Sequence, residues 1–350
     1  MELLDLIKIG TEKNASDIHL TVGVPPIFRI NGSLIKYGEE TLKPEDTKKL
    51  VQEILNERQF EELDKNGEID TSFSNPGVGR FRVNAYKQRG SYGAALRIIS
   101  LKIPTMEELR LPKSASDLAR QPRGLVLVTG PTGSGKSTTL ASMIDLINHE
   151  RSCHILTLED PIEYLHKHDK SIVNQREIGS DSHSFSNALR AALRQDPDVI
   201  LVGEMRDLET IGIALTAAET GHLVFSTLHT LGAAKTIDRI IDVFPPHQQQ
   251  QIRIQFASTI QGIISQQLLQ KTDGSGRVAA FEVMIATPAI RNLIREEKSY
   301  QIDTAIQTGA KYGMETMDNS ILEYYKKGMI SRETALNQAF NVELMKRYVI

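Results

Sequence analysis

The segment 130–137 reads GPTGSGKS, and its G-x-x-x-x-G-K-S spacing constrains the fold of this chain more than any other feature. Glycines at these positions let successive backbone N–H groups point inward at phosphate oxygens, while the lysine and the hydroxyl can contact the β/γ-phosphates and Mg²⁺. An apolar run at 125–128 precedes the segment, and residues 137–144 can form a helix whose N-terminus faces the phosphates. This context favours a nucleotide site over a glycine-rich turn that happens to carry a lysine. The predicted nucleotide-binding residues are Gly130, Pro131, Thr132, Gly133, Ser134, Gly135, Lys136, Ser137 and Thr138.

Three carboxylates, Glu159, Asp160 and Glu163, stand just after the apolar run 155–158. Open α/β sheets build their sites at the carboxyl ends of their strands, so this group can supply a base that activates water. Acidic residues at strand ends are often only solvated. Their position after a phosphate-binding loop in chain order favours the functional interpretation.

Two later strand-like runs, 199–202 and 223–227, supply further candidates. Glu204 follows the first run and is the carboxylate expected near the water shell of a Mg²⁺ ion. Gly203 stands where many such NTPases carry an aspartate, which disfavours direct metal ligation. His229 follows the second run and could sense a γ-phosphate, although a histidine in apolar surroundings is more often a hydrogen-bonded structural group.

Composition excludes several classes of protein. The 350 residues carry a net charge of −3, which gives no general nucleic-acid footprint, and 24% charged with 40% hydrophobic residues is typical of a globular protein. No run approaches the ~18 apolar residues of a membrane span, and acids near the N-terminus are unlike a secretory signal. We expect a cytosolic protein unless a partner holds it at a membrane. Cys153 is the only cysteine, which excludes an intramolecular disulfide and a cysteine-based zinc knuckle.

The first hundred or so residues have the pattern of a separate α+β unit. Its predicted elements are a helix at 3–9, strands at 16–22 and 27–30, a turn at Asn31-Gly32, a helix from Pro44, and a hairpin of strands 79–86 and 92–99. Alternation along strand 79–86 places Arg80 and Arg82 on one face and Phe81 and Val83 on the other. Such a row of arginines is more often solvated than functional, but it could also reach a phosphate on a neighbouring subunit.

The remainder of the chain divides by its hydrophobic pattern. Apolar residues between 252 and 268 keep an i, i+4 stripe, which predicts a core-facing helix followed by a hairpin near residue 274 and then by helices only. The predicted domains are residues 1–112, a linker at 113–120, and an ATPase domain at 121–350 whose core ends near residue 265 and whose helical subdomain covers 266–350.

Four segments in chain order resemble the motifs of secretion and type IV pilus ATPases. They are GPTGSGKST at 130–138, LTLEDPIE at 156–163, RQDPDVILVGEMRD at 194–207 and TGHLVFSTLHT at 220–230, which resemble the Walker A motif, the Asp box, an atypical Walker B motif and the His box. ASDIHL at 15–20 is similar to the start of the family's PAS-like domain, and AIRNLIRE at 289–296 to a signature of its pilus retraction members. The resemblance covers essentially the whole chain. It implies an α/β fold, with a PAS-like N-terminal α+β domain followed by a RecA-like P-loop NTPase domain with a C-terminal helical extension.

The resemblance also implies a reaction. A homohexameric ring would hydrolyse ATP, with Mg²⁺ as cofactor, to drive retraction of type IV pili and support twitching motility. The implied roles are Glu163 as general base, Glu204 with Ser137 as the Mg²⁺ site, His229 as γ-phosphate sensor, and Arg82 and Arg97 as phosphate-contacting arginines on domain closure, with Arg80 a weaker candidate.

The implied partners are further copies of the chain and an inner-membrane pilus platform protein. The ring would lie on the cytoplasmic side of the inner membrane at the pilus base, with no nucleic acid bound and no insertion into the membrane. Three alternatives remain: a related pilus or secretion assembly ATPase, a nucleic-acid translocase on the same core, and a regulatory nucleotide-binding module without turnover. The single cysteine and short N-terminal region disfavour the first, because those ATPases usually carry a four-cysteine zinc motif and an extra domain. The acidic net charge disfavours the second, and the presence of both Glu163 and Glu204 disfavours the third.

Overall fold

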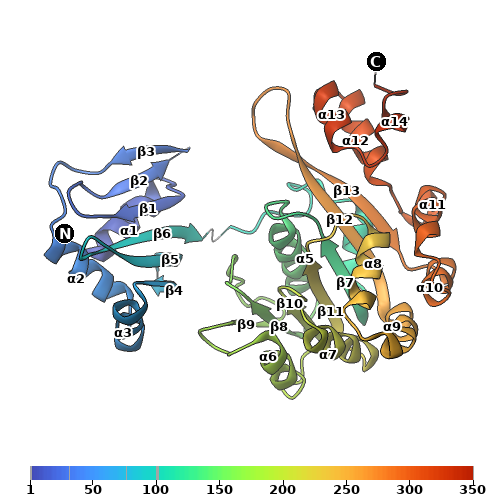
Figure 1. Ribbon diagram of the computed structural model, residues 1–350, viewed down its shortest axis with the longest axis horizontal. Coiled ribbons are helices and arrows are strands. Elements are labelled where there is room, and N and C mark those ends of the chain that lie inside the picture. The colour runs from blue at the N-terminus through green and yellow to red at the C-terminus, as the bar shows by residue number, and fades with distance from the viewer. Residues whose placement is uncertain (1, 31, 76, 100–101, 350) are drawn as a thin grey trace. The chain divides into compact units, whose positions relative to one another are not determined.

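The computed structural model describes residues 2–30, 32–75, 77–99 and 102–349, and two separate sheets organise the chain (Figure 1). The first unit is Met1–Lys102 with Glu163–Leu165, and the second is Ile103–Ile162 with His166–Ile350. Each unit has its own apolar core. The division in the chain therefore falls between Lys102 and Ile103.

The first unit is a six-stranded antiparallel sheet in the order β3-β2-β1-β6-β5-β4. Its elements are α1 (Leu3–Glu12), β1 (Asp17–Leu20), β2 (Ile27–Ile30), β3 (Ser33–Lys36), α2 (Pro44–Ile54), α3 (Glu57–Asn66), β4 (Glu68–Asn75), β5 (Gly79–Gln88) and β6 (Ser91–Ile99). Phe81 and Val83 of β5 are buried in a core shared with all three helices, whereas Arg82 is exposed, as strand alternation predicts. Strands β2 and β3 pair as a hairpin, and the predicted turn residue Asn31 lies outside the described residues.

The second unit is a seven-stranded sheet in the order β13-β12-β7-β11-β10-β8-β9, parallel except for β13. Its strands are β7 (Gly124–Thr129), β8 (His154–Glu159), β9 (Ile172–Glu177), β10 (Val199–Val202), β11 (Leu223–Leu228), β12 (Ile260–Gln270) and β13 (Arg277–Ile285). Its α-helices are α4 (Lys113–Ala119), α5 (Lys136–Glu150), α6 (Phe185–Ala192), α7 (Leu208–Glu219), α8 (Ala233–Asp242), α9 (Pro246–Thr259), α10 (Pro288–Arg295), α11 (Ile302–Gln307), α12 (Met317–Lys326), α13 (Arg332–Gln338) and α14 (Val342–Met345), and two 3₁₀ turns span Ser299–Gln301 and Ala310–Tyr312.

Helices cover both faces of the second sheet, which explains the unbroken apolar runs of its strands. Along β7, Val126 and Val128 pack against α4 and α5, while Leu125 and Leu127 pack against the layer formed by helices α6 to α10 (Figure 1). The strands predicted at 125–128, 155–158, 199–202 and 223–227 therefore form the centre of this sheet.

Residues 113–120, which the sequence predicts as a linker between the domains, instead contain helix α4. Ala115, Leu118 and Ala119 are buried in the core of the second unit. Prolines flank this short helix: Pro112 is its N-cap and Pro122 follows its last residue by three positions.

The continuous helix predicted across 252–268 is also wrong in its second half. Helix α9 ends at Thr259 and strand β12 begins at Ile260, so the sheet extends beyond the predicted core boundary near residue 265. Strand β12 is buried on both faces between β13 and β7, and an apolar run of that kind does not reveal its period. In the part of the chain that the structure describes after β13, every helix or strand element is a helix, the first of them beginning at Pro288.

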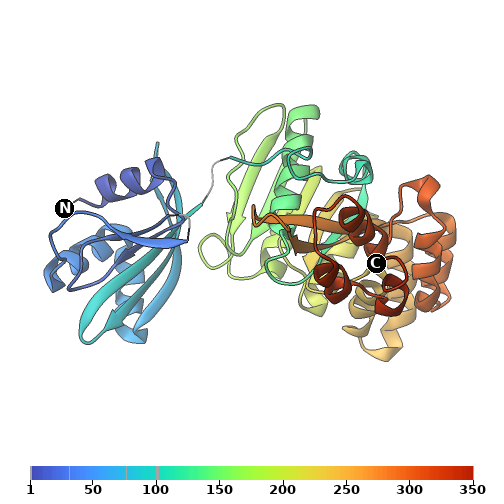
Figure 2. The ribbon, with the colours of Figure 1, turned by 90° about the horizontal axis from the view of Figure 1, so that it is seen from above.

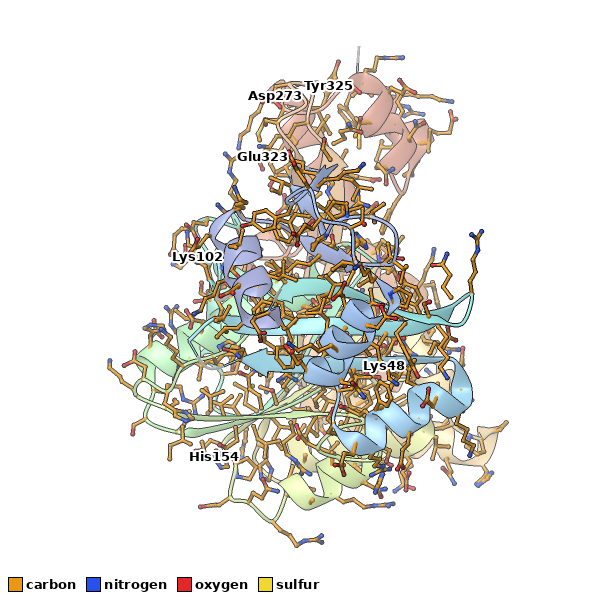
Figure 3. All side chains as sticks on the ribbon, turned by 90° about the vertical axis from the view of Figure 1, so that its left-hand side faces the viewer. Lys48, Lys102, His154, Asp273, Glu323 and Tyr325 are labelled. Carbon is orange, nitrogen blue, oxygen red and sulfur yellow. The ribbon has the colours of Figure 1, made fainter. Side chains whose placement is uncertain are left out.

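Helices α12 to α14 pack beside the β12–β13 hairpin (Figure 2). Leu269 and Val278 of the hairpin share an apolar cluster with Met317 and Ile321 of α12. Figure 3 labels Asp273 at the hairpin tip and Glu323 and Tyr325 of α12 at the same end of the unit, where the Thr272 N–H donates to the Met329 carbonyl at 3.0 Å.

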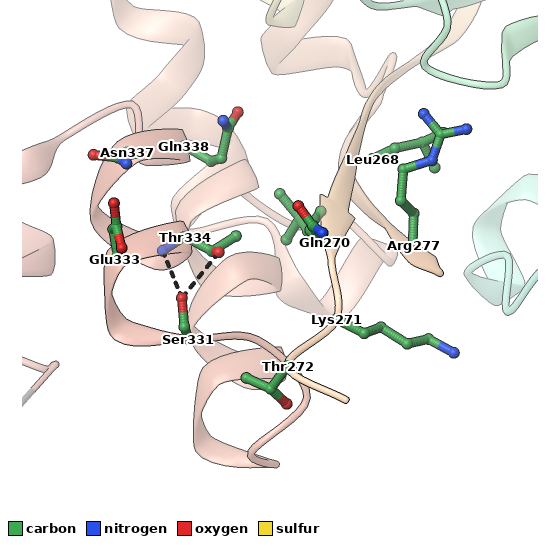
Figure 4. Close-up of a pocket in the computed structure, with 11 residues that line it drawn as sticks. Leu268, Gln270, Lys271, Thr272, Arg277, Ser331, Glu333, Thr334, Asn337 and Gln338 are labelled. Atoms are coloured by element: carbon green, nitrogen blue, oxygen red, sulfur yellow. Dashed lines mark hydrogen bonds between the residues drawn. The ribbon is translucent and has the colours of Figure 1, made fainter. Parts of the chain in front are cut away.

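The hairpin and α13 also line an open groove of about 610 Å³ (Figure 4). Polar side chains dominate its walls, among them Lys271 and Arg277 on the hairpin and Ser331 at the N-cap of α13. None of the predicted site residues lines this groove.

Helix α10 carries residues 289–295 of the AIRNLIRE segment. Its side chains divide between the apolar core and the end of helix α9. Ile290 and Ile294 are buried and Leu293 packs partly against the same core. Arg291 does not point away from the core: its guanidinium donates to the Ala257 and Ser258 carbonyls, at 2.6 and 3.0 Å, at the C-terminus of α9. Reversing the charge of Arg291 would therefore disturb folding.

Candidate nucleotide site

The phosphate-binding loop joins β7 to the N-terminus of α5, as its sequence predicts. Gly130, Gly133 and Gly135 all have positive φ, and Gly135 is the N-cap of α5. At Gly130 space is also decisive, since a Cβ there would lie 2.3 Å from the Gln266 carbonyl oxygen. The Ser137 hydroxyl lies in the first turn of α5, where free helix N–H groups favour an anion.

Lys136 is 9% exposed and already faces the loop interior. Its ammonium donates to the carbonyls of Gly130 and Pro131 at 3.0 and 3.1 Å. These bonds hold the positive charge of Lys136 on the inner side of the phosphate-binding loop. The arrangement suits a polyphosphate, whose oxygens could replace the carbonyls as acceptors.

Gln266 of β12 fixes the floor of the loop, and the sequence analysis did not find it. Its side-chain amide donates to the Ser134 carbonyl at 2.6 Å, and its side-chain oxygen accepts from the Thr139 hydroxyl at 2.9 Å. The residue is 1% exposed. A single buried side chain thus binds the loop and the first turns of α5 at the same time.

We expect Gln266→Ala to weaken ADP binding about tenfold or more, because it leaves the buried Ser134 carbonyl without its donor. Titration with a fluorescent ADP analogue measures this directly. Gln267→Ala is the matched control, since the adjacent glutamine is also buried but its amide donates toward the Gln338 carbonyl at 3.4 Å. Equal affinities for the two variants would contradict the role given to Gln266.

Polar side chains that follow two neighbouring strands, β10 and β11, meet beside the loop. The Glu204 carboxylate lies 3.1 Å from His229 Nε2, and His229 Nδ1 lies 3.4 Å from the Thr132 hydroxyl. Arg206 pairs with the same carboxylate. The structure therefore brings Glu204 and His229 together beside the phosphate-binding loop.

The Glu204 carboxylate is held in its ionised form. Burial would raise its pKa, but the hydrogen bond from Arg206 and the charge of His229 hold that pKa below its usual value. An ionised carboxylate at this position can orient the water shell of a divalent cation.

Gly203, the departure from the usual aspartate, has a steric cause. A Cβ at this position would lie 3.1 Å from the Leu158 carbonyl oxygen and 3.3 Å from Cα of Glu159. The chain passes so close to the end of β8 that a larger residue would push the two strand ends apart. Glu204, one residue later, is the carboxylate that reaches His229.

Glu163 and Asp160 are both exposed in the loop after β8, whereas Glu159 is only partly exposed. The Glu159 carboxylate accepts from Thr157 and Gln175 at 2.6 and 3.2 Å, which is a structural role. Glu177 of β9, 3% exposed, accepts the Ile162 N–H at 3.0 Å and so fixes the backbone just before Glu163.

Arg82 and Arg97 belong to the first unit, where they lie directly opposite each other on β5 and β6. The next partner across the sheet is Asp17 of β1, and Arg29 of β2 lies opposite Asp17. Arg97 Nε is 3.0 Å from the Asp17 carboxylate and Arg29 Nε is 3.8 Å from it. Burial would raise the pKa of Asp17, but its hydrogen bonds from Ser16 and Arg97 hold it below the usual value.

No cluster of three or more histidine, cysteine, aspartate or glutamate side chains that could hold a metal occurs among the described residues. A P-loop Mg²⁺ does not need one, because its ligands are a hydroxyl, phosphate oxygens and water. Across the same residues, none of the helices combines the length and apolar character of a membrane span.

Together, a parallel sheet covered by helices on both faces, a phosphate-binding loop at a helix N-terminus and an adjacent ionised carboxylate define a RecA-like P-loop ATPase. A family model described as Type II/IV secretion system protein matches residues 6–338. The chain belongs to the type II/IV secretion system protein family, and it is an ATPase of that family's type IV pilus retraction class.

Relatives in two bacteria support the class. The chain is 52% identical to the type IV pilus retraction ATPase PilT of Pseudomonas aeruginosa, over 97% of this chain and 98% of that protein. It is 48% identical to a twitching motility protein of Neisseria gonorrhoeae, over 98% of this chain and 92% of that protein. A crystal structure of the pilus retraction motor PilT with bound ADP matches with a TM-score of 0.92 and 52% identity, covering 99% of both chains. The predicted fold class and class of function are confirmed.

Proposed function

We propose that the chain assembles as a homohexameric ring that hydrolyses ATP to retract type IV pili, and that this activity supports twitching motility. The observation that carries the proposal is the full-length likeness to a pilus retraction motor, at 52% identity and a TM-score of 0.92. The ring would lie on the cytoplasmic side of the inner membrane at the pilus base and contact an inner-membrane platform protein. Copies of the chain would be its other partners, and no nucleic acid is required.

ATP would bind on the loop 130–138, with the Lys136 ammonium on the β/γ-phosphates. Mg²⁺, held by the Ser137 hydroxyl and through water by Glu204, would neutralise phosphate charge during hydrolysis. Support for this assignment is the position of Ser137 in the first turn of α5 and of the Glu204–His229 pair beside Thr132. Glu163 would take a proton from the attacking water, and His229 would sense the γ-phosphate.

Deletion of the gene in the host cell, followed by imaging of pili and of surface motility, tests the direction of the motor. We expect excess pili that do not retract and loss of twitching, because a retraction motor is needed only after assembly. Complementation with the wild-type gene restores retraction. Cells without any pili would instead indicate an assembly ATPase.

The nucleic-acid alternative is tested on the purified protein. Phosphate release is measured with and without single- and double-stranded DNA, and we expect no stimulation by either. A DNA-stimulated rate would favour a translocase on the same core.

A further inference from the structure

Glu282 is a buried carboxylate that the hydrolysis reaction does not use directly. It lies on β13, is 4% exposed, and its Oε1 accepts the Ala233 N–H at 2.8 Å, at the first residue of α8. The backbone N–H of Met317, the first residue of α12, also acts to lower the pKa of this carboxylate, so it lies near the same side chain. Glu282 therefore lies at the starts of two helices that are 84 residues apart in the chain.

The first of these helices follows directly from His229. Three residues, Thr230 to Gly232, separate His229 from α8. This turn is fixed to the sheet because the Gly232 N–H donates to the Ser265 hydroxyl of β12 at 2.9 Å. The turn is also bound to α8, because the Thr236 hydroxyl of that helix donates to the Gly232 carbonyl at 2.7 Å. A displacement of His229 would therefore be transmitted to the first turn of α8.

The second helix binds the C-terminal segment, which returns to the same turn. The Asp318 carboxylate accepts the N–H groups of Phe340 and Asn341 at 2.7 and 2.9 Å. The Phe340 ring lies against Gly232, since a Cβ on that glycine would be 3.3 Å from the ring. Glu282, α12 and Phe340 thus close a circuit of contacts around the turn after His229.

We propose that Glu282 is a positioning residue for ATP hydrolysis: it couples the turn after His229 to α12 and the C-terminal segment, so that these parts respond to nucleotide together. The proposal rests on the sensor role proposed for His229. Burial disfavours the charged form of the Glu282 carboxylate and raises its pKa to about 7. The backbone N–H groups of Ala233 and Met317 act in the opposite direction, because they favour the charged form. Glutamine has nearly the same shape but a single accepting oxygen and no charge, so Glu282→Gln removes the linkage with little change in volume.

The test is hydrogen exchange of the full-length protein with and without a non-hydrolysable ATP analogue, combined with ATP turnover. In the wild type we expect the analogue to slow exchange in both the peptide covering 230–236 and the peptides covering 317–341. In Glu282→Gln we expect the response of 317–341 to the analogue to disappear, the dissociation constant of the analogue to stay within about threefold, and kcat to fall about tenfold, the scale of one hydrogen bond to a charged group. Glu315→Gln is the matched control, because this partly buried glutamate two residues before Met317 pairs with β13 only through its backbone.

Phe340→Ala tests the circuit from its other side, and because Phe340 is 46% exposed the variant should fold. We expect it also to reduce the response of the 317–341 peptides to the non-hydrolysable ATP analogue. A normal response and normal turnover in both Glu282→Gln and Phe340→Ala would overturn the proposal. A His229→Ala variant with unchanged turnover would count against the sensor role alone, since the exchange response to the non-hydrolysable analogue needs no hydrolysis.

Discussion

Glu163→Gln is expected to slow ATP hydrolysis by about 10²–10⁴-fold while nucleotide still binds, which is the range for loss of a general base. The physical reason is that the amide keeps the size of the side chain but cannot take a proton from water. Glu163 is exposed in a loop whose backbone is fixed by the Glu177–Ile162 hydrogen bond, so the substitution should leave the fold unchanged. Steady-state phosphate release gives the rate, and titration with a fluorescent ADP analogue gives the affinity.

Two further variants separate the role of Glu163 from other effects. Asp160→Asn removes an exposed carboxylate from the same loop and should change turnover far less. Lys136→Ala removes the ammonium that faces the loop interior, so it should lose productive nucleotide binding itself. Loss of binding in Glu163→Gln equal to that in Lys136→Ala would contradict the assignment, as would an Asp160→Asn enzyme that is equally slow.

Local sequence was sufficient to predict the parts of the site whose geometry is local. The glycines at 130, 133 and 135 have positive φ in the structure, and both flanking elements form as their residues predict. Glu204 and His229 could be predicted because each directly follows a buried strand, and parallel strands bring their carboxyl ends to one edge.

Long-range partners could not be predicted in the same way. Gln266 contacts Ser134 across 132 positions of sequence, and Glu282 contacts Ala233 across 49. Both lie on strands buried on two faces, for which an apolar period of 2 cannot be told from one of 3.6 over so short a run. One signal could have found Gln266. The polar pair Gln266 and Gln267 lies inside an apolar strand, and buried amides need hydrogen-bond partners.

Arg291 is a related case. It caps the C-terminus of α9 through two backbone carbonyls, a contact that its position in an amphipathic helix does not predict. Burial and the nearby Arg295 lower its pKa, as expected for a cation removed from water. A helix period tells which residues face the core, but not whether a long side chain at the margin reaches back to a neighbouring helix.

Arg82→Ala and Arg97→Ala are each expected to slow ATP turnover about 10³-fold, by analogy with arginine fingers, while nucleotide binding and assembly persist. Arg97 can leave its present partner, because its side chain is 68% exposed and a surface ion pair such as Arg97–Asp17 is worth about 1 kcal/mol or less. A terminal phosphate group carries more negative charge than the Asp17 carboxylate and offers two oxygens to the guanidinium fork. Phosphate-release rates, ADP affinity and particle mass in solution test the three parts of this expectation.

Arg29→Ala is the matched control for the arginine row, since Arg29 lies on the same sheet face and also approaches Asp17, at 3.8 Å. Removing its charge changes the potential of the face by the same amount as removing that of Arg97. If all three variants slow turnover equally, the effect comes from the general charge of the sheet and not from phosphate contact. Wild-type turnover in Arg82→Ala and Arg97→Ala would instead leave both as solvated residues. Only a large loss confined to these two supports closure of the first unit onto bound nucleotide, because a specific contact depends on position while a diffuse potential does not.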